Sequence, residues 1–244
     1  MNNRSPYTFQ NGLKDGLPIG IGYLSVSIGL GLMCVVQGLS VFAAIFMSVV
    51  NMTSAGEVAG LSVIVAGGTL TELMISQLIV NLRYSLMSLS VSQRLDAGMN
   101  TWKRMIISFG ITDEVFAVST SKKEAVGFFY MLGLILPCML GWTLGTSLGA
   151  VAGNIMPMMI RNALGLAIYG MFIAILVPPM RKNAAVLAAT LFAAAISCCI
   201  HYLPCFSSIG AGFSIIISGV VAAAVLAVLV PYQEKEEEGV AEKK

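Results

Sequence analysis

Long apolar runs separated by short polar stretches dominate the chain. Five of them are long enough to cross a bilayer, because a membrane-spanning helix needs roughly 20 apolar residues. A longer apolar region, residues 39–80, has room for two more crossings. The pattern predicts an all-α polytopic membrane protein of about seven transmembrane helices. The five clear runs are residues 17–37, 125–148, 160–178, 184–202 and 209–230.

The two ends of the chain differ from this apolar centre. We expect an N-terminal segment over residues 1–16, a transmembrane domain over residues 17–230 and a charged tail over residues 231–244. The tail contains "EKEEEGVAEKK", a composition typical of solvated, disordered chain.

Two similar stretches hint at an internal repeat. "LPIGIGY" and "LPCMLGW" share Leu-Pro, a later Gly and then an aromatic residue. Three crossings between the two starts would make the copies antiparallel, which predicts an inverted repeat with halves 17–104 and 121–230. Prolines in the first turns of two unrelated helices would explain the same match.

Composition supports a membrane protein and narrows its function. Only 11% of the residues are charged, whereas soluble domains carry about 25%. A net charge of +2 without one basic patch argues against a nucleic-acid partner. Five cysteines without loop or metal-ligand spacing predict neither disulfides nor a metal site, and we expect no cofactor. A single histidine and no Cys/His cluster disfavour an enzyme, and the lack of a phosphate-binding loop disfavours an ATPase.

Basic residues in the loops predict the orientation in the membrane. With seven spans, the basic residues of segments 83–104 and 122–123 fall on one face together with the C-terminus. This face is expected to be cytoplasmic, which places the N-terminus outside. Segment 105–120 is too short to span upright, and we expect a re-entrant or interfacial helix there.

Three stretches match the capping box, in which a Ser or Thr hydroxyl and a Glu three residues later bond reciprocally to backbone amides. They are Ser54–Glu57, Thr69–Glu72 and Ser121–Glu124. The first two begin helices inside apolar sequence and therefore predict discontinuous helices, which build midplane substrate sites in transporters. Ordinary loops near the membrane surface are the alternative.

Two adjacent acids interrupt the apolar stretch "ISFGITDEVFAVST". Acids inside a membrane cost roughly 2.5–3.5 kcal/mol and usually serve function. Asp113 and Glu114 lie about 100° apart on a helix and cannot both face one partner. We expect one of them to pair with Arg83 and the other to line a pathway or bind a proton. Alternatively, Thr112 caps a short interfacial helix with both acids in its solvated first turn.

A continuous helix from Thr69 would place Glu72 and Arg83 on one polar stripe and Asn81 on the next. Such stripes usually face a bundle interior or a cavity. Arg83 has the alternative of an anchor at the membrane surface. Glu57 and Glu72 have the alternative of being capping partners only.

Four stretches, "LKDGLPIGIGYLSVSIGLG", "TSAGEVAG", "IVNLRYSLMSLSVS" and "GITDEVFAVS", occur in this order. Over about residues 12–180 the chain resembles the large subunit of the AzlC-type branched-chain amino-acid exporters. Glu57 stands where Gln or Ser is expected, and Tyr84 stands where His is expected. Both departures bear on substrate preference.

The resemblance implies a secondary transporter in the bacterial cytoplasmic membrane that exports valine, leucine, isoleucine or methionine by alternating access. It also implies a small AzlD-type membrane subunit as partner, with a homo-oligomer as a further alternative. A non-transporting scaffold subunit and a channel for small solutes are the alternative functions. The candidate substrate-binding or pathway residues are Ser54, Gly56, Glu57, Thr69, Glu72, Asn81, Arg83, Thr112, Asp113 and Glu114.

Overall fold

A computed structural model describes residues 6–155, 157, 159, 170, 173, 176–181, 183–206 and 209–229. These residues form helices, and their only β contact is an isolated bridge between Leu95 and Val126, which confirms the all-α prediction. Most of the predicted span 160–178 and the tail 231–244 lie outside the described residues. Among the described residues, the helices that are long and apolar enough to span a membrane are α1 (Phe9–Val36), α8 (Phe128–Ile155), α10 (Ala184–Tyr202) and α11 (Ala211–Leu229).

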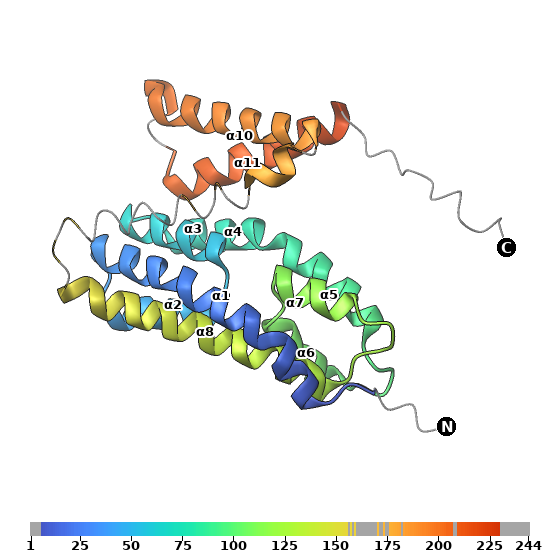
Figure 1. Ribbon diagram of the computed structural model, residues 1–244. Coiled ribbons are helices and arrows are strands. Elements are labelled where there is room, and N and C mark those ends of the chain that lie inside the picture. Colours follow the sequence, from blue (N-terminus) through green and yellow to red (C-terminus); the bar gives the residue numbers. More distant parts are fainter. Residues whose placement is uncertain are drawn as a thin grey trace.

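Helices α1 and α8 form the centre of the protein and lie side by side (Figure 1). Glycines bring their backbones into contact, because a Cβ atom on either side would clash with a carbonyl oxygen of the other helix. Gly12 lies against Tyr130 near one end, and Gly31 lies against Thr146 near the other. The contacts advance in the same direction along both helices, so α1 and α8 are parallel. The antiparallel relation expected of an inverted repeat is therefore wrong for this pair.

The two helices nevertheless match closely in length and in the position of their proline. Each has 28 residues, and Pro18 and Pro137 are the tenth residue of their helix. Neither is a first-turn proline. Helix α1 begins at Phe9, ahead of the predicted start at residue 17, because the Thr8 side chain caps it and accepts from the amide of Asn11.

The region 39–80 forms three short helices, α2 (Val41–Asn51), α3 (Ser54–Val65) and α4 (Leu70–Val80). Each rises less than about 20 Å, whereas the hydrocarbon core is about 30 Å thick. The expectation of two full crossings here is therefore wrong. Helices α2 and α3 reverse direction at Met52, which has a φ of 46°, and form a hairpin.

Helix α4 continues into α5 (Leu82–Arg94) with a single break at Asn81. The expected continuous helix from Thr69 is thus interrupted, because Asn81 ends one helix and begins the next.

Segment 105–120 belongs to a second hairpin, made of α6 (Thr101–Phe109) and α7 (Asp113–Thr120). Helix α6 runs parallel to α8, since Lys103 lies over the ring of Phe128 and Gly110 lies against Ile135. Helix α7 returns beside α5. The two hairpins therefore enter the helix bundle from opposite ends.

An ion pair corrects the expected placement of the N-terminal region. The Nζ atom of Lys122, which follows α7, lies 2.7 Å from the Oδ2 atom of Asp15 in α1. Tyr130, near the start of α8, donates to the same carboxylate oxygen at 2.7 Å. The start of α1 thus lies at the same end of the protein as Lys122, not at the opposite end.

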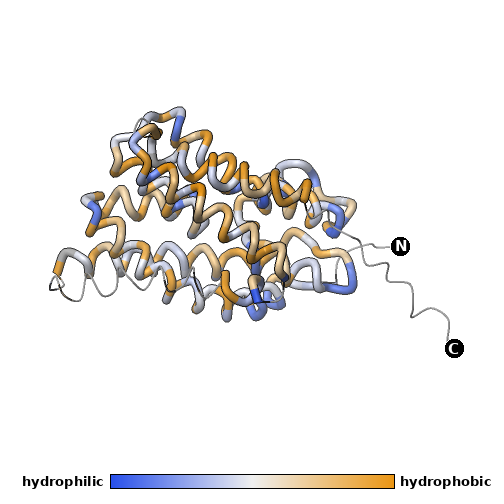
Figure 2. The backbone as a smooth tube through the Cα atoms, turned by 90° about the horizontal axis from the view of Figure 1, so that it is seen from above, coloured by the Kyte–Doolittle hydropathy of each residue, from blue (hydrophilic) through white to orange (hydrophobic). Residues whose placement is uncertain are grey.

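Helices α10 and α11 pack against each other and are joined through a short 3-10 helix, Pro204–Phe206. Helix α11 also packs on α3 and α4, so α10 and α11 lie on the side of the protein that α3 and α4 form (Figure 1). Hydrophobic positions dominate the helices, and hydrophilic positions gather mainly at the turns (Figure 2).

Candidate functional site

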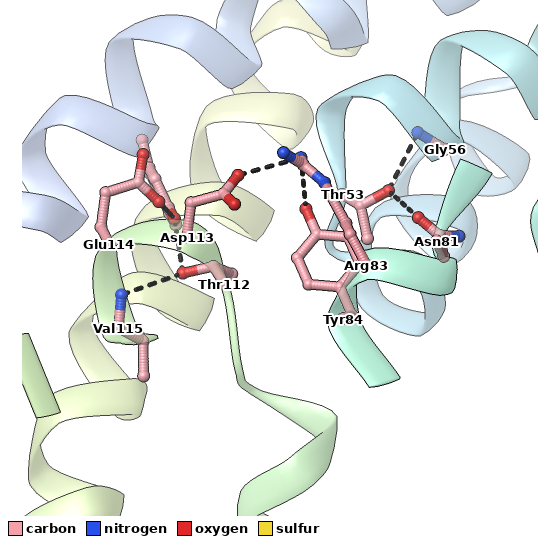
Figure 3. Close-up of polar contacts among 10 residues, drawn as sticks. Thr53, Gly56, Asn81, Arg83, Tyr84, Thr112, Asp113, Glu114 and Val115 are labelled. Carbon is pink, nitrogen blue, oxygen red and sulfur yellow. Dashed lines mark hydrogen bonds and ion pairs between the residues drawn. The ribbon is translucent and has the colours of Figure 1, made fainter. Parts of the chain in front are cut away.

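Two helix starts meet at mid-depth of the central pair. Helix α3 begins after Thr53, whose hydroxyl accepts from the amide of Gly56 at 2.9 Å. Helix α7 begins after Thr112, whose hydroxyl accepts from the amide of Val115 at 3.4 Å. The cap expected at Thr112 is confirmed (Figure 3). The cap of α3 is Thr53 rather than Ser54, because Ser54 is already the first helical residue.

A cavity of about 590 Å³ lies between these two helix starts, within the size range of small-molecule sites. Its polar groups come from the tips of both hairpins and from the start of α5, and its apolar groups come largely from α1. The lining residues are Ile19, Gly22, Tyr23, Val26, Met52, Thr53, Ser54, Ala55, Arg83, Tyr84, Thr112, Asp113, Glu114, Trp142 and Leu176.

Asp113 and Arg83 form an ion pair across the cavity, with 2.9 Å between Oδ2 and Nη2 (Figure 3). The predicted partner is therefore confirmed. The same Arg83 nitrogen donates to the hydroxyl of Tyr84 at 3.1 Å, and the guanidinium lies over the Tyr84 ring. Both charged side chains are about half exposed, so the pair is accessible to a ligand in the cavity.

Glu114 has a different partner from its neighbour, as the helical geometry predicted. Its Oε2 atom accepts a hydrogen bond from the hydroxyl of Tyr23. The hydroxyls of Tyr23 and Thr112 are also hydrogen bonded, at 2.7 Å. Both acids occupy the first turn of α7, as the capped-helix alternative stated. That turn lines the cavity.

Glu57 lies beside the cavity rather than in its wall. The side chain is 0% exposed, and its Oε1 atom accepts from the indole Nε1 of Trp142 at 2.6 Å. Its Oε2 atom has no hydrogen-bond partner among the described residues. The role of a capping partner is therefore wrong for Glu57, because its carboxyl group faces α8.

Asn81 joins the break between α4 and α5 to the tip of the first hairpin. Its Oδ1 atom accepts from the Thr53 hydroxyl at 3.0 Å, and its amide nitrogen donates to Gln77 at 3.0 Å. Gln77 also accepts from Asn51 at 3.1 Å and donates to the carbonyl of Gly56 at 2.7 Å. This network fixes the start of α3 against the helix break.

Thr69 and Glu72 lie apart from the other candidates. The Thr69 hydroxyl accepts from the Glu72 amide at 3.1 Å, as the capping box predicts. The Glu72 carboxylate instead accepts from the amides of Gly212 and Phe213, at 2.8 and 3.3 Å. It thereby caps the first turn of α11, and neither residue lines the cavity.

The third capping box, Ser121–Glu124, is wrong. Ser121 follows the last residue of α7, and its hydroxyl donates to the carbonyl of Val118 at 2.8 Å. The next helix begins only at Phe128.

Tyr23, Trp142 and Gln77 are functional candidates that were not predicted from the sequence. The first two are the aromatic residues that end the matching stretches "LPIGIGY" and "LPCMLGW". That match was the available signal. No sequence pattern indicated the hydrogen bonds of Tyr23 and Trp142, because their acid partners are far away in the sequence.

The sequence profile of the family described as "AzlC protein" matches residues 18–156. This stretch is more than half of the chain and contains both hairpins and both central helices, apart from the first turns of α1. The chain belongs to the AzlC family.

Individual relatives agree with this assignment. The chain is 29% identical to inner membrane protein YgaZ of Escherichia coli K12 over 151 residues, which are 60% of this chain and 62% of YgaZ. The chain thus matches less than two thirds of the length of YgaZ. An uncharacterized membrane protein of Archaeoglobus fulgidus is 31% identical over 175 residues, covering 71% of this chain and 76% of that protein. No solved structure matches.

The long apolar helices and these relatives make the AzlC-family protein a multi-pass protein of the inner membrane. The resemblance seen in the sequence is confirmed at the level of the family.

Proposed function

We propose that this AzlC-family protein is a secondary transporter subunit that exports branched-chain amino acids. The observation that carries the proposal is the cavity of about 590 Å³ at mid-depth of α1 and α8, where two capped helix starts meet an arginine and two acids. Discontinuous helices with their ends at mid-depth are a recurrent way to bind a solute within a membrane. Valine, leucine and isoleucine are the favoured substrates, with methionine as a further candidate.

The two helix starts suit opposite ends of a zwitterion. A helix start presents free amides and a positive dipole end. At α7 this end is already balanced by Asp113 and Glu114. At α3 the cavity wall holds Ser54 and Ala55, whereas Glu57 is turned away toward α8. We therefore assign the substrate carboxylate to the start of α3 and the substrate ammonium group to the acids of α7.

The remaining wall suits an aliphatic side chain. Ile19 and Val26 of α1 and Met52 of the first hairpin line the cavity. An apolar branch of the substrate would lie against them and be removed from water, which contributes about 25 cal/mol per Å² of buried apolar surface. The flexible thioether of Met52 can fit branches of different shape.

The hairpins suggest a topology that differs from seven simple spans. We propose that α2–α3 and α6–α7 each enter half of the bilayer from opposite faces, and that α4 and α5 together make one broken crossing. With the predicted span 160–178, these elements and α1, α8, α10 and α11 give six crossings.

The basic residues then indicate the orientation. The end of the protein at which α1 and α8 begin carries Lys122 in an ion pair with Asp15. The basic residues at the end of α5 and the start of α6 lie at the same end of the protein. The bridge between Leu95 and Val126 shows this, because it joins the segment after α5 to the segment before α8. By the positive-inside rule this end faces the cytoplasm. The start of α1 and the end of α11 then both face the cytoplasm.

A small AzlD-type membrane subunit is the proposed partner, on the basis of the family alone. Co-purification from cells that express both chains tests this. A homo-oligomer would instead give particles of this chain alone with a mass above that of a monomer.

Counterflow of labelled leucine into liposomes tests the transport function. We expect saturable uptake that unlabelled valine and isoleucine compete with, and its loss in Asp113→Asn. Asp15→Asn is the matched control, because Asp15 pairs with Lys122 near the start of α1 and does not line the cavity. Protein and partner that fold but give no counterflow with any branched-chain amino acid would leave a scaffold role. Non-saturable flux would indicate a channel.

A further inference from the structure

Glu57 has surroundings that suit a neutral carboxyl group. The side chain is 0% exposed and lies on α3, one turn after the start that lines the cavity. Its single hydrogen bond is the one that Oε1 accepts from Trp142. Its Oε2 atom is buried without a partner among the described residues. A buried carboxylate normally has its oxygens bonded to several donors or to a cation.

No cation faces Glu57 from the described helices packed around it. Helices α2 and α11 contain no ionisable side chain, and α8 contributes the indole of Trp142. Helix α1 contributes the thiol of Cys34, which is itself buried. Helix α4 contributes Glu72, whose carboxylate is bound to the amides of Gly212 and Phe213. An ionised Glu57 would therefore be an uncompensated charge, which is costly in an apolar interior.

Glu57 is linked to the cavity through residues that line it. Trp142 lines the cavity and holds the Glu57 carboxyl group on its indole nitrogen. Ser54 and Ala55, at the start of the same helix, line the cavity as well. A movement of α3 away from Trp142 would expose the carboxyl group to water in the cavity, and the return of α3 would require the carboxyl group to be neutral.

We propose that Glu57 binds the proton to which transport is coupled, and that α3 packs against Trp142 only when the Glu57 carboxyl group carries this proton. This inference rests on the proposed transport function and adds the identity of the coupling ion. The proton binds to one carboxylate oxygen and leaves from it, so no other reactant is needed. Asp113 and Glu114 are not proposed as the proton site, because each has a partner in the cavity that stabilises the ionised carboxylate. Asp113 pairs with Arg83, and Glu114 accepts from the Tyr23 hydroxyl.

Proton flux in liposomes loaded with a pH-sensitive dye tests the proposal. We expect addition of leucine to wild-type protein to change the internal pH, in either direction, in proportion to the leucine moved. In Glu57→Gln, which resembles the neutral carboxyl group, we expect leucine counterflow to persist while the pH change is lost. Glu72→Gln is the matched control and should keep the pH change, since Glu72 serves as a helix cap.

Infrared spectroscopy of the purified protein provides a readout that needs no transport. A neutral Glu57 gives a carboxylic-acid carbonyl band at neutral pH that is absent in Glu57→Gln. Trp142→Phe should shift this band and keep it, because the indole donor to Oε1 is removed and the acid remains. The shift in Trp142→Phe identifies the band even where Glu57→Gln does not fold.

The outcomes separate this proposal from the transport function. Absence of flux of every branched-chain amino acid in the wild type would overturn the transport function, and absence of the infrared band would overturn the proton site. Leucine flux without a pH change, or a pH change that Glu57→Gln retains, would overturn proton coupling at Glu57 while leaving leucine transport intact.

Discussion

Tyr23 and Trp142 occupy the same position in two parallel helices and touch each other. Each is the fifteenth residue of a 28-residue helix, and their rings meet edge to face with centroids 5.4 Å apart. Tyr23 donates to Glu114 in one hairpin, and Trp142 donates to Glu57 in the other. The centre of the α1–α8 pair thus binds an acid in the first turn of α3 and another in the first turn of α7, the second helices of the two hairpins. A movement of either hairpin would therefore change a hydrogen bond to this centre.

Removal of the Tyr23 hydroxyl should weaken substrate binding in the cavity without unfolding the protein. Tyr23→Phe keeps the ring contact with Trp142 and removes the hydrogen bonds to Glu114 and Thr112. The hydroxyl holds the Glu114 carboxylate to which the substrate ammonium group is assigned, so the KM for leucine counterflow should rise, by up to about tenfold. Tyr202→Phe is the control, because Tyr202 is exposed at the end of α10. An unchanged KM in Tyr23→Phe would place this hydroxyl outside the substrate path.

The ion pair between Arg83 and Asp113 should matter for transport far more than for stability. Both side chains are about half exposed, and exposed pairs contribute only about 0–1 kcal/mol. We expect Arg83→Ala and Asp113→Asn to unfold within a few degrees of the wild type, since about 1 kcal/mol shifts the unfolding temperature of a domain this size by roughly 2–4 °C. Counterflow should be lost in both variants.

A comparison with Lys122→Ala separates a local effect from a general one. Lys122 pairs with Asp15 at the cytoplasmic end proposed above, outside the cavity. We expect this variant to retain leucine counterflow. Thermal unfolding monitored by tryptophan fluorescence measures the stability of each variant, and counterflow measures its transport. A large loss of stability in Asp113→Asn alone would mean that the acid is structural.

The sequence allowed the helices and several of their starts to be predicted, because hydropathy and capping are local. The cap at Thr112, the partner of Asp113 and the limits of α10 all followed from residues close in sequence or from the scarcity of charges. The prediction of a cap was wrong where two neighbouring residues could both serve as the cap. Thr53 and Ser54 both carry a hydroxyl, and the three-residue pattern selected the wrong one.

Relations between distant helices were not predictable in the same way. The parallel packing of α1 and α8 depends on glycines that meet carbonyl oxygens of the other helix, and hydropathy does not identify which helices pair. The partners of Glu57 and Glu72 lie 85 and 140 residues away. A local pattern therefore suggested capping for both glutamates, although their carboxyl groups bind other helices.

The glycine contacts between α1 and α8 predict opposite effects for Gly149 of α8 and Gly29 of α1. A Cβ on Gly149 would clash with the carbonyl of Ile28, whereas a Cβ on Gly29 meets nothing within 4 Å. Gly149→Ala should destabilise the protein by about 1–3 kcal/mol, the usual cost of overpacking. Gly29→Ala should stabilise it by about 0.5–1 kcal/mol, because alanine favours the helix.

Thermal unfolding of both variants in one detergent measures this difference. Equal unfolding temperatures for Gly149→Ala and Gly29→Ala would argue that the two helices do not pack as closely as the glycine contacts require.

Glu72 should hold the C-terminal helix pair to the rest of the protein. Its carboxylate accepts from the amides of Gly212 and Phe213 at the start of α11. Glu72→Ala leaves these buried donors without an acceptor, at a cost of about 1–3 kcal/mol. We expect hydrogen exchange in the first turn of α11 to become roughly 5- to 150-fold faster. Thr69→Ala removes only the cap of α4, so exchange should rise at the start of α4 and stay unchanged in α11. Rapid exchange of the first turn of α11 in the wild type itself would show that Glu72 does not hold this helix in the membrane.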